Sequence, residues 1–308
     1  MKIFVKIKIM KPSYLKLSKK ELDSRINNLF KILENCEICP RKCNVNRIKE
    51  EKGFCQLGYL LKISDFFPHF GEEKPLVGQR GSGTIFLTSC NLACVYCQNY
   101  EISQDRKGKE ISFKELAKIM IGLQNLGCHN INFVTPTCQV PQIVKAIAEA
   151  IKMGLEIPLV YNTNSYDSLK TLKLLEGIFD IYLPDAKYSD NKIGEKYSLV
   201  KNYFEIMKIA IKEMHRQVGD LILDEKGIAK RGLIVRHLLL PNDLAGSEKI
   251  FEFLAKEISK NTYLNIMKQY WPAFKAFEYP ELSRKISEKE YQKAISLAKK
   301  FGLKRLEL

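Results

Sequence analysis

Apolar and polar positions along the chain follow two different periods, which succeed one another in a regular order. From about residue 83 onward, short apolar runs rich in β-branched and aromatic residues predict six strands, at 84–89, 130–135, 159–163, 180–184, 233–240 and 263–269. Apolar residues spaced three and four apart predict helices at 113–126, 140–153, 167–176, 201–217, 246–258 and 287–301. Near-continuous apolar strands that alternate with helices favour a parallel sheet covered by helices. The pattern therefore predicts an α/β protein with a partial, TIM-like (β/α)6 barrel, two units short of a closed eight-fold barrel.

The N-terminal part of the chain has a different organisation. A helical period over 14–35 leads into a cysteine-rich stretch, and 56–82, broken by prolines and glycines, is predicted to be a connecting segment. We therefore expect three parts: 1–35 as a strand and helix leader, 36–80 as a four-cysteine metal motif with its linker, and 81–308 as the barrel. The first ten residues alternate apolar residues with lysine and have no small-residue cleavage site, so they predict neither a signal peptide nor a membrane span.

Composition adds three expectations. A chain of 308 residues with 45% hydrophobic residues can form one domain of barrel size with a small extension. The net charge of +15 comes from scattered lysines, which are usually a solvated surface but would also favour an acidic partner. Seven of the nine cysteines fall into two clusters, which favours metal ligation over disulfides and therefore a reducing, cytoplasmic location.

One cluster, Cys90, Cys94 and Cys97, follows directly on the first predicted barrel strand. The carboxyl ends of barrel strands are where α/β barrels carry their sites, and thiolates in such loops are the usual ligands of iron–sulfur clusters. Three ligands would leave one iron of a [4Fe-4S] cluster free for an exogenous molecule. The alternative is a structural zinc site with a fourth ligand from elsewhere, or three cysteines that are neighbours by chance.

The other cluster consists of Cys36, Cys39, Cys43 and Cys55. Four thiols at these spacings suffice either for a closed tetrahedral zinc site or for an all-cysteine iron–sulfur cluster, and the sequence leaves the metal open. A closed site has no free coordination position, so its expected role is structural, with electron relay as the alternative.

The Cys-x3-Cys-x2-Cys pattern, with Tyr96 before its last cysteine, resembles the signature of the radical S-adenosylmethionine (SAM) superfamily. Together with the four-cysteine motif, the string at 90–104 resembles a pyruvate formate-lyase activating enzyme-like subgroup whose substrate is undetermined. The resemblance implies a [4Fe-4S] cluster whose open iron chelates SAM, reductive cleavage of SAM to a 5′-deoxyadenosyl radical, and abstraction of a substrate hydrogen. It also implies a laterally open barrel and an external electron donor such as flavodoxin or ferredoxin.

Polar residues stand at the ends of the predicted strands, where the resemblance places SAM. The expected cofactor-binding residues are Tyr96, Thr135, Thr137, Asn162, Asn164, Asp185, Lys187 and Arg236. Asn162 stands where the relatives use an acid, so the monovalent cation site that the resemblance implies would be weakened or lost. Asp185 and Lys187 point the same way in a strand and can pair with each other or with SAM.

Two further residues are candidates with competing interpretations. Cys138 follows the second barrel strand and could be a ligand or a radical partner, although a small semi-buried residue is the commoner case. His237 lies inside an apolar run and is predicted to be a hydrogen-bonded core histidine. Cys128 is predicted to be core, and no catalytic side chain beyond the cofactor ligands is identified.

The leading functional hypothesis is a radical SAM oxidoreductase that abstracts hydrogen from a protein, peptide or small molecule, in the manner of glycyl radical enzyme activases. The second is a radical SAM maturase of a peptide or cofactor precursor, with an auxiliary cluster on the N-terminal cysteines. The third, of another class, is a metal-stabilised nucleic-acid-binding protein. Since the chain lacks the basic and aromatic interleaving of single-strand binders, we expect neither a nucleic-acid nor a membrane partner.

Overall fold

The computed structural model describes residues 10–308, so the strand predicted within the leader lies outside the described residues. The strands are β1 (Leu61–His69), β2 (Ser82–Leu87), β3 (Lys109–Ile111), β4 (Ile131–Val134), β5 (Leu159–Thr163), β6 (Ile181–Pro184), β7 (Ile222–Leu223), β8 (Ala229–Leu238), β9 (Tyr263–Met267) and β10 (Arg305–Glu307). The α-helices are α1 (Lys19–Ile32), α2 (Lys74–Val77), α3 (Tyr100–Ser103), α4 (Phe113–Asn125), α5 (Val140–Lys152), α6 (Leu169–Leu174), α7 (Asn191–Ser198), α8 (Tyr203–Val218), α9 (Ser247–Phe253) and α10 (Glu288–Lys300).

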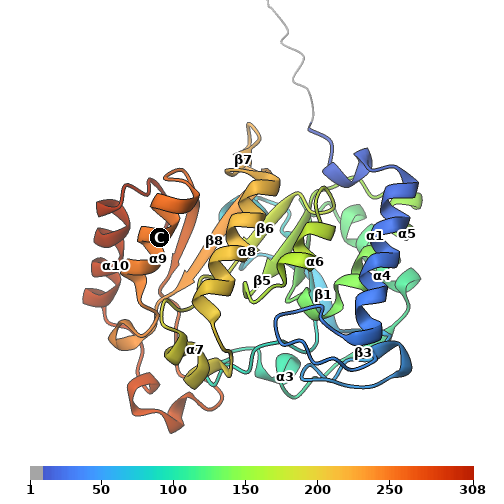
Figure 1. Cartoon of the computed structure of the whole chain (residues 1–308). Coiled ribbons are helices and arrows are strands. Elements are labelled where there is room, and N and C mark those ends of the chain that lie inside the picture. The colour runs from blue at the N-terminus through green and yellow to red at the C-terminus, as the bar shows by residue number, and fades with distance from the viewer. Residues whose placement is uncertain (1–9) are drawn as a thin grey trace, which may run out of the picture.

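One curved sheet with the order β10-β9-β8-β6-β5-β4-β2-β1-β3 runs through the molecule, with helices around it (Figure 1). The six predicted barrel strands, β2, β4, β5, β6, β8 and β9, pair in parallel in that order. Among the described strands, β3 and β10 form the two edges and do not pair with each other, so the sheet is not closed. The partial barrel and its β/α order are thereby confirmed.

The prediction of a connecting segment at 56–82 was wrong in one respect, since this stretch contains the nine-residue strand β1. β1 pairs antiparallel with β2 and with β3, and Pro68 lies opposite Gly83 near its end. Only Leu61 and Ile63 are fully buried in it, so the alternation of apolar residues is too short to indicate a strand. Proline near a strand end removes few ladder hydrogen bonds, which explains why the strand tolerates Pro68.

The two faces of the barrel strands bury different side chains, as the period of two requires. Outward residues such as Phe133, Tyr161 and Val235 join the main core beneath the helices. Inward residues of β5, β6 and β8 instead form a second core around Leu76 of α2. Asn130 Nδ2 donates to the Leu76 carbonyl at 2.9 Å. The short β1–β2 connection therefore fills part of the barrel interior.

Serine caps begin three of the helices that cover the barrel. The side chains of Ser18, Ser112 and Ser287 each accept a hydrogen bond from the backbone N–H three residues later. The glutamate at that later position accepts a hydrogen bond from the backbone N–H of the serine, so α1, α4 and α10 each start with a capping box. α9 continues into a π-helical turn, Leu254–Ile258.

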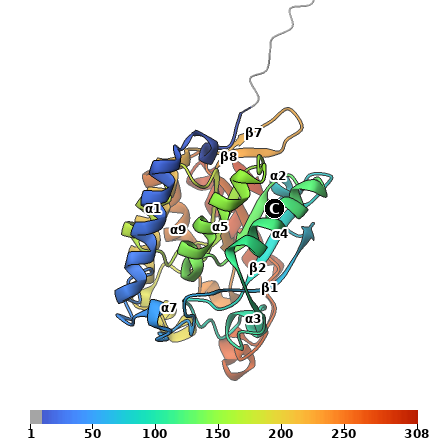
Figure 2. The same ribbon diagram turned by 90° about the vertical axis from the view of Figure 1, so that its right-hand side faces the viewer.

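Residues 36–55 lie at the same end of the sheet as α3 and α7 in both views (Figures 1 and 2). Both cysteine clusters are therefore at the carboxyl ends of the parallel strands, although a long stretch of sequence separates them. In the part of the chain that the structure describes, no helix is both long and apolar enough to span a bilayer.

Candidate functional site

The three cysteines that follow β2 open on one cavity of about 160 Å³ at the carboxyl ends of the barrel strands. The cavity is lined by Leu87, Ser89, Cys90, Leu92, Cys94, Cys97, Asn99, Ile102, Ser103, Val134, Thr135, Asn162, Thr163, Asn164, Asp185, Lys187 and Arg236. The polar strand ends of β4, β5, β6 and β8 therefore face the cysteine loop, as expected for chemistry carried at this end of an α/β barrel.

Hydrogen-bond donors lie next to the sulfurs of Cys90 and Cys94. Cys90 Sγ accepts from the Leu92 backbone N–H and from Asn164 Nδ2, each at 3.3 Å, and Ser198 Oγ donates to Cys94 Sγ at 2.9 Å. Burial raises the pKa of Cys90 to about 12 and that of Cys94 to about 11. Ligation by a metal centre is what would bring such thiols to the thiolate at neutral pH, and the donors then stabilise the negative sulfur.

Over residues 10–308, no three His, Cys, Asp or Glu side chains converge tightly enough to hold a single metal ion. A cubic iron–sulfur cluster spreads its ligating sulfurs more widely than one ion does. Cys90, Cys94 and Cys97 line one cavity, and their assignment as cluster ligands stays a prediction.

Unusual backbone conformations occur at three successive strand ends of this cavity. Ser89, Thr135 and Ser165 have φ values of 69°, 59° and 66°, in the left-handed region that residues with a side chain rarely occupy. Such strain tends to cluster at ligand sites. Ser89 lines the cavity, and its buried hydroxyl has no hydrogen-bond partner among the described residues.

A group of charged side chains at the carboxyl ends of β6 and β8 lines the same cavity as the cysteines. Asp185 Oδ1 accepts from Arg236 Nε, and its Oδ2 accepts from Lys187 Nζ, both at 2.8 Å. Burial by itself would raise the pKa of Asp185, but Arg236 and Lys187 together lower it below its usual value. All three groups are therefore ionised at neutral pH, and Asn162 Oδ1 accepts a further bond from Arg236.

Sequence reasoning missed the acidic partner of Arg236 on its other side. Glu72, in the β1–β2 connection, has Oε2 at 3.6 Å from Arg236 Nη1. Glu73 is buried next to it, and its Oε1 accepts from Asn265 Nδ2 at 3.0 Å. The connecting stretch carried no signal for this contact, because its entry into the barrel interior is a tertiary feature.

The eight residues expected to contact SAM divide into two groups. Thr135, Asn162, Asn164, Asp185, Lys187 and Arg236 line the cavity together with the three cysteines. Tyr96 and Thr137 do not. The Tyr96 ring is buried, with its hydroxyl bonded to that of Tyr188, and Thr137 is turned away into the interior.

Thr137 belongs to a buried network around Asp167, which sequence reasoning also missed. Asp167 accepts hydrogen bonds from Thr137 Oγ1 and Tyr161 Oη, both at 2.8 Å, and from Thr163 Oγ1 at 2.6 Å. Burial raises the pKa of Asp167, while the three hydroxyls oppose that shift. The network joins the ends of β4 and β5 beneath the cavity, so Thr137 positions the site from below. The available sequence signal for this network was an acid, Asp167, four residues after the polar strand end at Thr163.

The N-terminal cysteines are brought together as predicted. Cys36, Cys39, Cys43 and Cys55 line one small cavity, which also includes Asn91 from the cysteine loop of the barrel. The segment is folded tightly, since a Cβ atom on Gly53 would lie 2.8 Å from the Cys43 sulfur.

Arg41 fastens this segment to the barrel's cysteine loop. Its Nε donates to the Asn91 carbonyl at 2.6 Å, its Nη2 donates to the Leu199 carbonyl at 2.7 Å, and its guanidinium lies 3.4 Å from the centre of the Phe54 ring. The two cysteine clusters are therefore neighbours in space.

His237 is a core residue, as predicted. It is fully buried, with Nδ1 2.6 Å from the Ala186 carbonyl and Nε2 2.9 Å from Ser247 Oγ. Burial lowers its pKa to about 4, so the ring is neutral at pH 7. Cys128 is likewise buried, which confirms the prediction for that residue.

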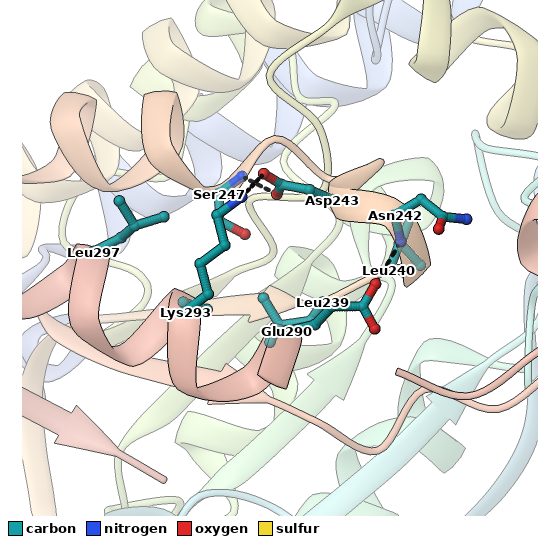
Figure 3. Close-up of a pocket in the computed structure, with 9 residues that line it drawn as sticks. Leu239, Leu240, Asn242, Asp243, Ser247, Glu290, Lys293 and Leu297 are labelled. Carbon is teal, nitrogen blue, oxygen red and sulfur yellow. Dashed lines mark hydrogen bonds and ion pairs between the residues drawn. The ribbon is translucent and has the colours of Figure 1, made fainter. Parts of the chain in front are cut away.

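A larger cavity, of about 250 Å³, lies between the turn that follows β8 and helix α10 (Figure 3). Its polar groups pair with one another: Lys293 with Asp243 at 3.3 Å, and Glu290 with the Asn242 backbone N–H at 2.7 Å. It contains none of the residues predicted for the site, so its size alone does not make it the reaction centre.

Comparisons with known proteins agree with this site. The family model described as the radical SAM superfamily matches residues 84–224, which include all three barrel cysteines. The uncharacterized protein MJ0674 of Methanocaldococcus jannaschii is 39% identical over 292 residues, covering 92% of this chain and 79% of that protein.

Two solved structures have a similar course of the chain at low sequence identity. The FeFe-hydrogenase maturase HydG from Carboxydothermus hydrogenoformans has a TM-score of 0.50 at 14% identity, over 71% of this chain and 50% of HydG. A domain of pyruvate-formate lyase-activating enzyme from Bacteroides vulgatus has a TM-score of 0.37 at 16% identity, over 52% of this chain and 84% of that domain. The first concerns the fold alone, and the second is too distant to support an argument.

The family match covers the cysteine loop and the strands β4, β5 and β6 at the cavity and ends before β8, and the 39% identical relative covers 92% of the chain. The chain therefore belongs to the radical SAM superfamily, whose enzymes use a [4Fe-4S] cluster and SAM.

Proposed function

We propose that the protein cleaves SAM reductively at this cavity and uses the resulting 5′-deoxyadenosyl radical to abstract a hydrogen atom from a substrate. One observation carries the proposal: Cys90, Cys94 and Cys97 share one cavity with the ionised side chains of Asp185, Lys187 and Arg236. The cysteines can ligate a metal cluster, and the charged side chains can bind the zwitterionic amino-acid part of SAM.

Different side chains would bind the cluster and SAM. Cys90, Cys94 and Cys97 would hold the [4Fe-4S] cluster, which supplies the electron for SAM cleavage when bound. Lys187 and Arg236 provide cationic donors for the SAM carboxylate, and Asp185 keeps both of them oriented toward the cavity. The buried Ser89 hydroxyl, which has no partner among the described residues, could donate to a polar group of the nucleoside after a change of rotamer.

The type of substrate follows from the motif resemblance and the open sheet. We propose an activating-enzyme-like oxidoreductase that acts on a protein, a peptide or a small molecule, since an unclosed barrel leaves lateral room for a large substrate. An external donor such as flavodoxin or ferredoxin would supply the electron, and a reducing cytoplasm suits the nine free cysteines. We expect no nucleic-acid substrate and no membrane association.

The deciding experiment is anaerobic. The protein is reconstituted with iron and sulfide, SAM and a strong reductant are added, and 5′-deoxyadenosine is measured. We expect its formation in the wild type and its loss in Cys94→Ala, while Cys128→Ser, at a buried cysteine remote from the cavity lining, serves as the matched control. Formation of 5′-deoxyadenosine by the Cys94→Ala variant at the wild-type rate would refute the proposal.

A second candidate is a maturase of a peptide or cofactor precursor that carries an auxiliary cluster. The observation in its favour is the N-terminal cysteine cavity, which shares Asn91 with the cysteine loop of the barrel. More than about four iron atoms per reconstituted chain would support it. Zinc in place of iron at the N-terminal site would argue against it.

A further inference from the structure

Cys138 occupies a position that the N-terminal cysteine motif alone does not reveal. It lies in the turn between β4 and α5, at 1% exposure, and it forms a buried cluster with Cys55 and Leu57. Its thiol lies beside the thiols of Cys39 and Cys55. A thiol from the barrel therefore stands among the thiols of the N-terminal segment.

Backbone N–H groups point at sulfurs in both cysteine clusters. In the N-terminal segment, the Phe54 backbone N–H donates to the Cys43 sulfur at 3.4 Å. The Leu92 N–H makes the same bond to Cys90 in the barrel's cysteine loop. Donors directed at sulfur favour the thiolate, the form in which cysteine binds metals.

A buried positive charge lies beside the same thiols. Arg47 is fully buried and donates from Nη1 to the Cys138 carbonyl at 2.8 Å and from Nη2 to the Gly58 carbonyl at 3.0 Å. Its positive charge also acts on the thiols of Cys36 and Cys55. Across residues 10–308 no carboxylate pairs with it. A buried guanidinium is costly without an anion nearby, and metal-bound thiolates would supply that negative charge.

We propose that Cys138 is a metal ligand, and that Cys39, Cys55 and Cys138, completed by Cys36 or Cys43, hold a thiophilic metal centre between the N-terminal segment and the barrel. An all-thiolate set suits an iron–sulfur cluster or zinc. Analysis of iron, sulfide and zinc per chain distinguishes the two forms.

This centre would stabilise the loop that carries the SAM site. Asn91 lines the cavity of the N-terminal cysteines, its Oδ1 accepts from Asn164 Nδ2 at 2.8 Å, and Asn164 also reaches the Cys90 sulfur. On the other side, Thr135 of the SAM cavity stands three residues before Cys138. Both routes connect the N-terminal thiols with the SAM site through short, buried contacts.

The test uses the full chain in a background that lacks the barrel ligands, Cys90→Ala, Cys94→Ala and Cys97→Ala, so that any metal bound belongs to the N-terminal site. Iron, sulfide and zinc per chain are measured after anaerobic loading, with ultraviolet–visible and Mössbauer spectra. We expect one centre in the background and at least roughly 100-fold weaker binding after Cys138→Ser, since even loss of an outer-sphere partner costs up to that much. Cys128→Ser, at another buried cysteine, should leave binding unchanged.

Two further variants separate ligation from packing. Cys138→Val fills the same space without a metal ligand, so its circular dichroism spectrum should equal that of the triple-alanine background protein while the metal is lost. Cys138→His supplies a different ligand and should restore metal binding. Cadmium-113 loaded protein without any substitution at Cys138 provides a direct check through scalar coupling of the metal to the Cys138 β-protons. Three results would overturn the proposal. They are an unchanged metal affinity in Cys138→Ser and Cys138→Val, cadmium coupling to the four N-terminal cysteines alone, and the absence of both iron and zinc from the background protein.

Discussion

Arg236 of β8 donates from Nε to Oδ1 of Asp185, which follows β6, at a distance of 2.8 Å. The two residues also form an isolated parallel bridge through their backbones, so the side-chain pair is fixed by the sheet itself. Asp185 is shared with Lys187, and Arg236 is shared with Glu72. The ion pair therefore sets the position of every charged group on this wall of the cavity.

Replacement of Asp185 by Asn should destabilise the fold and weaken SAM binding. The substitution leaves Lys187 and Arg236 close together without the carboxylate that pairs with both. Removal of one partner of a buried ion pair lowers the free energy of unfolding by about 3–5 kcal/mol. Urea unfolding measures the first effect, and equilibrium dialysis of SAM with reconstituted protein measures the second. The matched control is Glu101→Gln, which breaks an exposed pair with Lys107 and should change the free energy of unfolding little. Equal costs for the two variants would contradict the assignment.

Asn164 should tune the cluster through its bond to the Cys90 sulfur. Asn164→Ala removes this donor, and Asn164→Asp replaces it by an acceptor of the same shape that would repel a thiolate. Because hydrogen bonds to sulfur raise the reduction potential of such clusters, we expect a lower potential in the alanine variant and roughly 10-fold or greater loss of SAM cleavage in both. Anaerobic redox titration followed by electron paramagnetic resonance gives the potential. A potential equal to that of the wild type in Asn164→Ala would show that the bond does not act on the cluster.

Asp167→Ala should be strongly destabilising, because it leaves the hydroxyls of Thr137, Tyr161 and Thr163 buried without their common acceptor. One to three kcal/mol for each buried unsatisfied group, partly relieved by rearrangement, gives a loss of about 3 kcal/mol in the free energy of unfolding. Asp167→Asn retains one acceptor oxygen and should cost less. Asp105→Ala, at an exposed acid, is the control for urea unfolding, and a similar change in both variants would count against the network.

The neutral, buried ring of His237 predicts a dependence of stability on pH. Burial lowers its pKa in the folded protein to about 4, whereas an exposed histidine titrates near 6.5. Between these values the unfolded chain binds a proton that the folded protein does not, so stability is greatest above about pH 6.5 and falls as the pH is lowered. From pH 7 to 5 the contribution of His237 should amount to about 2 kcal/mol.

Urea unfolding under anaerobic conditions at several pH values in this window tests the His237 prediction. The free energy of unfolding of the wild type should decrease toward pH 5 more steeply than that of His237→Gln, which has no titrating ring at this position. Parallel pH profiles for the two proteins would mean that another group is responsible.

Short-range sequence features accounted for much of the fold and of the site. The loop with Cys90, Cys94 and Cys97 follows a strand because the apolar run at 84–89 ends directly before it, and six of the eight expected SAM-binding residues do line the cavity with these cysteines. The strand β1 escaped detection because Pro68 and the glycines around it interrupt the pattern, although antiparallel pairing with β2 holds it in place.

What the sequence by itself determined was the order of strands and helices, the two thiol motifs and the class of cofactor, because each is written in neighbouring residues and in the periods of two and 3.6. The tertiary structure alone decided which distant groups meet. Arg236 and Asp185 are 51 positions apart, and Cys138 reaches the N-terminal thiols only because the β4 end and the cysteine-rich segment lie at the same edge of the sheet. Strand register and chain packing bring such groups together, and no local pattern encodes either of them.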